Sequence, residues 1–318
     1  MYMVSLLSIL PFTAPACGSA QGGGEAPEAP RVYFVRDITP ENMVRLYEAL
    51  ERPATGKVAV KLSTGEPGGH NFLKPELIKD LVQKVDDTIV ECNTAYGGGR
   101  ASTENHLKAA ADHGFTAIAP VDIMDAEGEV SLPVKGGRHL RENFVGSHYP
   151  AYDFTVVLSH FKGHAMGGFG GAVKNISIGI ASSAGKAWIH SAGKTKNAAQ
   201  WGNLPAQDDF LESMAEAAKS VADHCGEKIL YINVMNNLSV DCDCDAHPED
   251  PKMGDIGILG STDPVALDKA CVDLVYASPD PGKVHLIERM ESRHGIHTLE
   301  HGEAIGLGSQ QYELVELE

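Results

Sequence analysis

Apolar and polar residues follow two patterns along the chain: short apolar runs and longer segments with apolar residues at helical spacing. The short runs predict strands at 57–62, 87–92, 117–123, 154–158, 228–235, 255–259 and 312–315. Helical spacing predicts helices at 73–85, 102–113, 208–224, 263–276, 285–293 and 297–304. Ser102 and Asp263 are the expected N-caps of two of these helices. The alternation predicts an α/β fold: a largely parallel or mixed sheet with helices on both faces.

The stretch 184–206 is rich in Gly, Asn, Gln and Lys and predicts a long loop or lid. We expect residues 31–318 to form the α/β domain. A division of that domain into two lobes near 180–225 stays open.

The first thirty residues have the pattern of an export signal. Val4 to Phe12 is apolar but too short to span a bilayer, and small residues precede Cys17. We expect a signal peptide at 1–16 and a flexible tether at 17–30. The pattern resembles a bacterial lipoprotein signal, which implies a lipid anchor at Cys17 in the periplasm or cell envelope. Ordinary cleavage after Ala16 and a disordered cytosolic leader are the alternatives.

Composition narrows the classes of partner. The 318 residues are 43% hydrophobic and 22% charged, which is typical of a globular protein, and the formal net charge is −17. Such an acidic chain is not expected to bind nucleic acid, or to meet a membrane except through the lipid anchor. A small anionic ligand would need a local basic pocket. The sequence leaves any protein partner open.

The stretch from Ser159 to Asn175 follows the predicted strand 154–158 and concentrates residues with chemical roles. His160 and His164 flank Lys162, and glycines precede Lys174. Histidines titrate near neutral pH, so His160, His164 and Lys174 are the candidate catalytic residues. The backbone of a glycine-rich loop can approach an anion closely. The candidate ligand-binding residues here are Lys162, Gly167, Gly168, Gly170, Gly171 and Asn175; a tight packed turn is the alternative.

A second glycine-rich segment follows the strand 87–92. It contains Asn93, Tyr96 and Arg100 around three glycines. An arginine can bind a carboxylate or phosphate through two hydrogen bonds. These residues, with Lys61 at the end of the first predicted strand, are further candidates for ligand binding. A turn with a solvated arginine is equally compatible with the pattern.

The segment DCDCDAH at 241–247 suggests a metal site. In an extended strand Cys242 and Cys244 would face one side and the three aspartates the other. Two thiolates and the imidazole of His247 would provide most of a zinc or iron site, with His160 or His164 as the fourth ligand. A local disulfide or an acidic surface loop is the alternative.

Several motifs in order resemble the DUF362 family, whose members are often labelled iron–sulfur centre proteins. They are VAVKLSTGEPGG, ECNTAYGGGR, SHFKGH…GFGGAVKNISIG, DCDCDAHP and DIGILGSTDPVALDKACVDL, and the resemblance as a whole covers Lys57 to Leu317. Many members carry a ferredoxin-like insertion after the GAVKN segment. This chain has only Cys225 between Asn175 and Asp241, so no resident [4Fe–4S] cluster is expected.

The segment GFGGAVK, with His164 ten residues before Lys174, also resembles one motif of the nickel-pincer lactate racemases. That resemblance implies histidines that move a proton, a lysine that holds the cofactor, and nickel as the metal. By contrast, His294, His297 and His301 lie at helical spacing, but Arg293 and Gly295 favour a solvated helix end over a metal site.

These features predict an exported protein with a metal-assisted site for a small anionic ligand. An enzyme of redox or proton-transfer type fits them best. The alternatives are a non-catalytic periplasmic binding protein for a metal or small ligand, and a nickel-pincer 2-hydroxy acid racemase or epimerase. The expected cofactor is a metal ion, either zinc or iron, with nickel as a further option.

Overall fold

The computed structural model describes residues 28–318, apart from the side chains of 201–203. The predicted signal peptide, the predicted lipidation at Cys17 and most of the tether therefore lie outside the described residues. Within the described range, none of the helices combines the length and the apolar character needed to cross a membrane.

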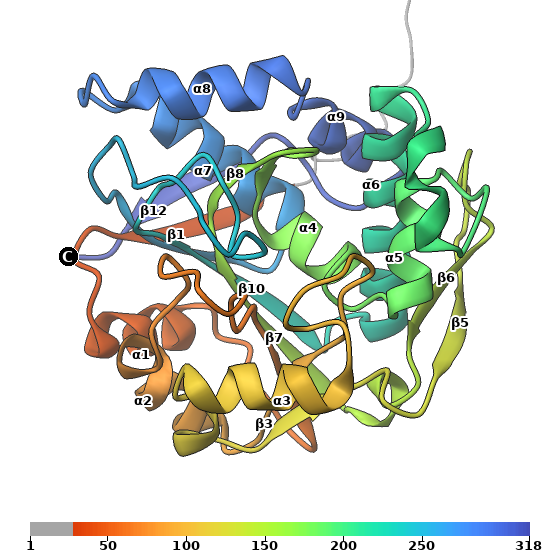
Figure 1. Ribbon diagram of the computed structural model, residues 1–318. Helices are drawn as coiled ribbons and strands as arrows, with labels where there is room; N and C mark the ends of the chain where they lie inside the picture. The colour runs from red at the N-terminus through yellow and green to blue at the C-terminus, as the bar shows by residue number, and fades with distance from the viewer. Residues whose placement is uncertain (1–27) are drawn as a thin grey trace, which may run out of the picture.

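One eight-stranded sheet runs through the molecule (Figure 1). Seven of its strands are parallel, and β11 alone runs against both of its neighbours. In spatial order the strands are β12 (Glu313–Glu316), β1 (Arg31–Val35), β11 (Gly257–Ser261), β10 (Ile229–Met235), β7 (Phe154–His160), β2 (Val58–Lys61), β3 (Thr88–Glu91) and β4 (Val121–Ile123). The largely parallel sheet predicted from the sequence is confirmed.

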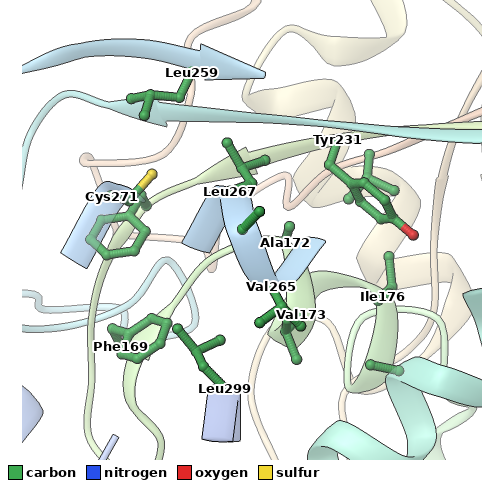
Figure 2. Packing of buried hydrophobic residues seen from close by; sticks show 14 of the residues in the cluster. Phe169, Ala172, Val173, Ile176, Tyr231, Leu259, Val265, Leu267, Cys271 and Leu299 are labelled. Atoms are coloured by element: carbon green, nitrogen blue, oxygen red, sulfur yellow. The ribbon is translucent and has the colours of Figure 1, made fainter. Parts of the chain in front are cut away.

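Helices cover both faces of this sheet, as predicted. On one face lie α1 (Pro40–Ala49), α2 (Pro75–Val85) and α3 (Thr103–Asp112). On the other lie α4 (Ala172–Ser177), α6 (Gln207–Cys225) and α7 (Pro264–Ala277), with α8 (Lys283–Ser292) and α9 (His297–Ala304) outside them. Figure 2 shows the core of this second face, where side chains of α4 and α7 pack against Tyr231 and Leu259 of the sheet. Burying these apolar surfaces drives the helices onto the sheet.

The sequence pattern located most elements within two or three residues, and the predicted caps are present. The Asp263 carboxylate accepts hydrogen bonds from the backbone N–H groups of Val265 and Ala266, and Ser102 accepts one from Asn105. The hydrophobic pattern did not predict the polar hairpins and several short elements. These are β1, α1, the hairpin of β5 (Glu129–Pro133) and β6 (Glu142–Gly146), the hairpin of β8 (Lys162–His164) and β9 (Gly168–Gly170), and α4.

The predicted long loop at 184–206 is wrong. Helix α5 (Ser183–His190) occupies its first part, and the 3₁₀ segment η3 (Ala198–Asn203) its last. Ser182 caps α5 by accepting a hydrogen bond from the Gly185 N–H. The helix forms because Ala187 and Ile189 are buried against neighbouring elements, although the apolar run 187–189 is short and polar residues flank it. The strand expected at 117–123 is also shorter, because a 3₁₀ turn, η1 (Phe115–Ala117), precedes β4.

Candidate functional site

A cavity of about 240 Å³ lies where β2, β3 and β7 end. The carboxyl ends of parallel strands meet at one edge of a sheet, so residues after these strands converge there. Lys61 ends β2, Glu91 ends β3 and His160 ends β7. The wall also includes the apolar side chains of Ala165, Met166 and Ile178.

A hairpin carries Lys162, His164 and the first glycines beside the cavity. Strands β8 and β9 pair antiparallel, and Gly168 in their turn has φ +80°, which favours glycine. A Cβ atom on Gly168 would lie 2.9 Å from the Cα of Gly295. These glycines therefore allow close backbone packing against the segment before α9. Gly167 and Gly168 do not line the cavity.

His160, Lys162 and Asp243 form a buried polar network. His160 Nδ1 lies 2.8 Å from one carboxylate oxygen of Asp243, and Lys162 Nζ donates to the other at 2.8 Å. His160 Nε2 donates to the carbonyl of Asn236 at 2.6 Å. Burial alone would raise the pKa of Asp243, but Lys162 and His160 outweigh it and hold that pKa well below its usual range. Both nitrogens of His160 are thus engaged, and neither is open to a substrate.

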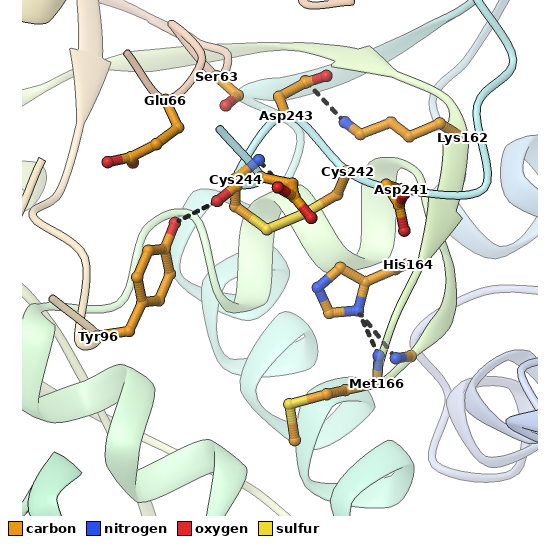
Figure 3. The surroundings of a disulfide bond; sticks show 12 residues. Ser63, Glu66, Tyr96, Lys162, His164, Met166, Asp241, Cys242, Asp243 and Cys244 are labelled. Atoms are coloured by element: carbon orange, nitrogen blue, oxygen red, sulfur yellow. Dashed lines mark hydrogen bonds and ion pairs between the residues drawn. A yellow bond between two sulfur atoms is a disulfide. The ribbon is translucent and has the colours of Figure 1, made fainter. Parts of the chain in front are cut away.

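His164 is neutral and faces the cavity wall. Its Nδ1 accepts hydrogen bonds from the backbone N–H groups of Gly167 at 2.9 Å and Met166 at 3.3 Å (Figure 3). Burial, followed by the nearby Lys174 and His190, lowers the pKa of His164 well below its ordinary value. Because Nδ1 is the acceptor, the single ring proton is on Nε2. His164 is therefore a hydrogen-bond donor for a cavity ligand.

Lys174 of α4 lines the cavity, and its side-chain amine has no hydrogen-bond or ion-pair partner among residues 28–318. A Cβ atom on Gly170 would lie 3.2 Å from Lys174 Cδ, so this glycine leaves room for the lysine chain. Burial, with the charge of Lys162, lowers the pKa of Lys174 to about 7. Its amine is therefore partly neutral at physiological pH.

The other cavity cations are engaged by the protein. Arg100 donates to Glu66 at 3.0 Å and lies 3.4 Å from Glu91. Lys61 donates to the carbonyl of Leu62 and lies 3.8 Å from Glu91; burial lowers its pKa to about 8 even so. Arg100 is 3% exposed. The alternative of a solvated arginine is therefore wrong, and its charge is already compensated.

The N-terminus of α4 holds an internal carboxylate. Asp268 of α7 accepts hydrogen bonds from the N–H groups of Ala172 at 2.7 Å and Val173 at 3.0 Å. A Cβ atom on Gly171 would lie 2.3 Å from Asp268, which explains the glycine. Burial raises the pKa of Asp268 to about 6. These backbone donors, expected to hold a ligand, instead bind Asp268.

The DCDCDAH segment forms turns, not the extended strand expected from its alternation. Cys242 and Cys244 are joined by a disulfide, which lines the cavity together with Asp243 (Figure 3). The Asp243 carboxylate turns toward Lys162. Tyr96 donates to the carbonyl of Cys244 at 3.2 Å and connects this segment to the Arg100 loop.

The geometry supports one part of the metal-site prediction and opposes another. His164, Cys242 and Cys244 offer ligand atoms within 4.8 Å of one another, so they form a group that could hold a metal ion. As a disulfide, however, the cysteines have no thiolate to offer. His164 Nδ1 is also already an acceptor, whereas a ligating histidine usually donates from its second nitrogen. The oxidised arrangement thus does not fit a metal ion. His247 is exposed and lies outside this group.

The structure brings together most of the predicted site residues. The cavity is lined by Lys61, Tyr96, Arg100, His160, Lys162, His164, Gly170, Gly171, Lys174, Asn175, Cys242 and Cys244. Asn93 is not among them, since its amide donates to Thr103. Sequence reasoning missed Glu91, Asp243, Lys186 and His190, which also line it. The position of Glu91 at a strand end was an available signal. Lys186 and His190 lie in the stretch 184–206, for which the sequence predicted a loop.

The cavity is basic in an acidic protein. Five cationic side chains line it against two carboxylates, Glu91 and Asp243. Lys186 donates to the carbonyl of Ala181 at 2.6 Å and has no carboxylate partner within residues 28–318. An anion is therefore the complementary ligand for this cavity.

Comparisons with known proteins found similar solved structures and a family. The lactate racemase apoprotein from Thermoanaerobacterium thermosaccharolyticum is 16% identical, with a TM-score of 0.44; 76% of this chain and 57% of that one are covered. A protein from Thermotoga maritima is 13% identical, with a TM-score of 0.41 and coverages of 74% and 59%. The chain thus spans less than two thirds of either protein. No curated protein matches it. The model of a domain of unknown function, DUF362, matches residues 58–273, and the chain belongs to that family.

Proposed function

We propose that this protein is an enzyme that binds a small organic carboxylate in the cavity and moves a proton at the adjacent carbon. Lys174 carries the proposal, because its amine faces the cavity and is unpartnered within residues 28–318. A partly buried ammonium without an ion-pair partner among residues 28–318 is costly, so the site favours a bound anion or a neutral amine.

Lys174 acts in two successive steps of such a reaction. The ammonium attracts the carboxylate and then releases its proton to water; with a pKa of about 7, the neutral amine can then take the proton from the carbon beside the carboxylate. His164, with its proton on Nε2, can donate a hydrogen bond to the substrate oxygen. His160 has both nitrogens engaged, so we assign the proton step to Lys174.

A metal-assisted form of this reaction would require reduction of the Cys242–Cys244 disulfide. Reduction of the Cys242–Cys244 disulfide would free two thiolates next to His164, a ligand set suited to zinc or iron. A nickel-pincer 2-hydroxy acid racemase or epimerase is the alternative in which Lys174 is not the base. There the Lys174 amine would hold the cofactor covalently. We assign no step to either group.

A redox function is the second candidate, and the position of the disulfide favours it. The Cys242–Cys244 disulfide lines a basic cavity, where small anionic thiols would be attracted. Two such thiols would reduce it to two cysteine thiols and leave as a small-molecule disulfide, with two electrons and two protons moving to the protein. Export and lipid anchoring at Cys17 remain proposals from the sequence.

Anion binding is tested first. Purified protein is titrated with two- to four-carbon carboxylates, their neutral amides, sulfate and phosphate. The heat of binding is measured by calorimetry, and the melting temperature is measured with and without each ligand. We expect a carboxylate, and not its amide, to bind the wild type and the Lys135→Met control, whose lysine is exposed. Lys174→Met should weaken binding at least tenfold. Equal binding by Lys174→Met would overturn the proposal.

Proton transfer is then tested by incubation of 2-hydroxy and 2-oxo acids with the protein in D₂O. Loss of the proton signal at the carbon beside the carboxylate, dependent on Lys174, supports the enzyme. Binding without exchange indicates a binding protein instead. A stable mass increase on the Lys174 peptide of protein from its native host would identify a covalent cofactor. Exchange of small thiols without proton exchange would favour the redox candidate.

A further inference from the structure

A ladder of histidines and carboxylates lies outside the cavity, between α6 and α9. Asp208, Glu212 and Glu216 are spaced four residues apart on α6, so they share one helix face. That face meets His294 before α9 and His297 within it. In the sequence, Arg293 and Gly295 favour a solvated helix end here. The opposing carboxylates, Asp208 and Glu212, lie 86 and 85 residues away from their histidine partners, so the spacing of the histidines does not reveal them.

We propose that Asp208, His294 and His297 form a binding site for a divalent transition-metal ion such as Zn²⁺ or Cu²⁺. One ligand atom from each lies within 4.8 Å of the others. Metal bonds of about 2.1 Å in a tetrahedral site place ligand atoms about 3.4 Å apart. Side-chain rotations alone can supply that difference. Two imidazoles with one carboxylate favour zinc or copper over Mg²⁺ or Ca²⁺.

The pairs present in the structure already hold the rings for this role. His294 Nδ1 lies 2.7 Å from Asp208 Oδ1, and the rings of His294 and His297 stack with centroids 5.0 Å apart. A metal ion would replace the proton between Asp208 and His294. The His294 side chain is about half exposed, so an ion can enter and water can complete the coordination.

Each ring nitrogen of His297 lies within hydrogen-bond distance of a carboxylate other than Asp208. Its Nε2 lies 3.1 Å from Glu212, and its Nδ1 lies 3.2 Å from Glu300. Whichever nitrogen binds the metal, the other keeps a carboxylate acceptor. Such a partner fixes the ring and increases its basicity as a ligand.

The proposed metal site is attached to the hairpin of the cavity. Gln207 donates to the carbonyls of Met166 at 2.7 Å and Arg293 at 2.8 Å. Gly295, next to His294, packs against Gly167 and Gly168. Metal binding should therefore stabilise the whole fold and not only a helix end.

The test is a calorimetric titration of the chelator-treated, oxidised full chain with Zn²⁺, and an electron paramagnetic resonance spectrum with Cu²⁺. We expect one equivalent to bind, a higher melting temperature, and a copper signal split by two nitrogens. Asp208→Asn, His294→Ala and His297→Ala should each weaken binding at least tenfold. His285→Ala removes an exposed histidine of α8 and should have no effect.

A Cys242→Ser/Cys244→Ser variant separates this site from the cavity cysteines and should bind the ion unchanged. Absence of binding by wild type would overturn the proposal. So would binding that survives all three ladder substitutions in folded variants, with folding checked by circular dichroism. Lys174→Met should leave metal binding intact, so this site and the proposed cavity function can fail independently.

Discussion

Lys162 donates a hydrogen bond to the buried Asp243 carboxylate across 2.8 Å, a contact between motifs 81 residues apart in sequence. Strand β7 ends shortly before Lys162, and its parallel partner β10 precedes the Asp243 segment. The pairing of these strands therefore brings the lysine and the aspartate to the same edge of the sheet.

Asp243→Asn should destabilise the protein by about 3–5 kcal/mol at pH 7, because it leaves Lys162 and His160 buried without a counter-charge. The pKa of Asp243 is lowered in the fold, so its contribution is present above about pH 4 and is lost as the pH falls further. Urea unfolding between pH 3 and 8 measures this. Asp245→Asn, at an exposed neighbour, is the control. Equal effects of the two substitutions would contradict the buried network.

Lys174→Met should stabilise the ligand-free protein at pH 7 by about 1–3 kcal/mol, since it removes a partly buried ammonium that has no ion-pair partner among residues 28–318. The pKa of Lys174 is about 7 in the fold and about 10.4 when unfolded. The unfolded state thus binds more protons between these values, and wild-type stability should rise there with pH. The advantage of Lys174→Met should shrink accordingly by pH 9.5 in urea unfolding. A constant difference would show that the amine has a partner.

Reduction of the native protein should expose two thiols, Cys242 and Cys244, to alkylation. Cys92 and Cys271 should stay unmodified, because both are buried and burial raises their pKa, for Cys92 to about 12. Peptide mass analysis with and without a reductant locates the adducts. Modification of Cys242 and Cys244 without reduction would refute the disulfide.

His190→Phe should make stability less sensitive to acid. Burial lowers the pKa of His190 to about 4, while an unfolded histidine titrates near 6.5. Between these values the unfolded state binds one more proton than the folded state. As the pH is lowered through this range, this residue therefore reduces the free energy of unfolding of the wild type by up to about 1.4 kcal/mol per pH unit. Phenylalanine keeps the stacking on Phe210. Urea unfolding at pH 4.5 and 7 should show a smaller drop for the variant; an equal drop would contradict burial of the ring.

Element type and the location of the site could be read from the chain. Apolar runs identified the strands that end at Lys61, Glu91 and His160, and parallel pairing placed those ends together. Helix α5 could not be read, because its stability comes from residues buried against distant elements. The roles of the glycines also needed the fold. Gly170 and Gly171, which also line the cavity, make room for Lys174 and Asp268.

The sequence by itself determined the α/β architecture, because hydrophobic periodicity is local, and it determined which residue types gather at the strand ends. Only the tertiary structure decided the charge state and availability of each group. In the fold, the Asp243 carboxylate accepts a hydrogen bond from Lys162, and both ring nitrogens of His160 have partners. The side-chain amine of Lys174 has none within residues 28–318. The physical reason is that desolvation and charge compensation depend on partners far away in sequence, which only packing brings within hydrogen-bond distance.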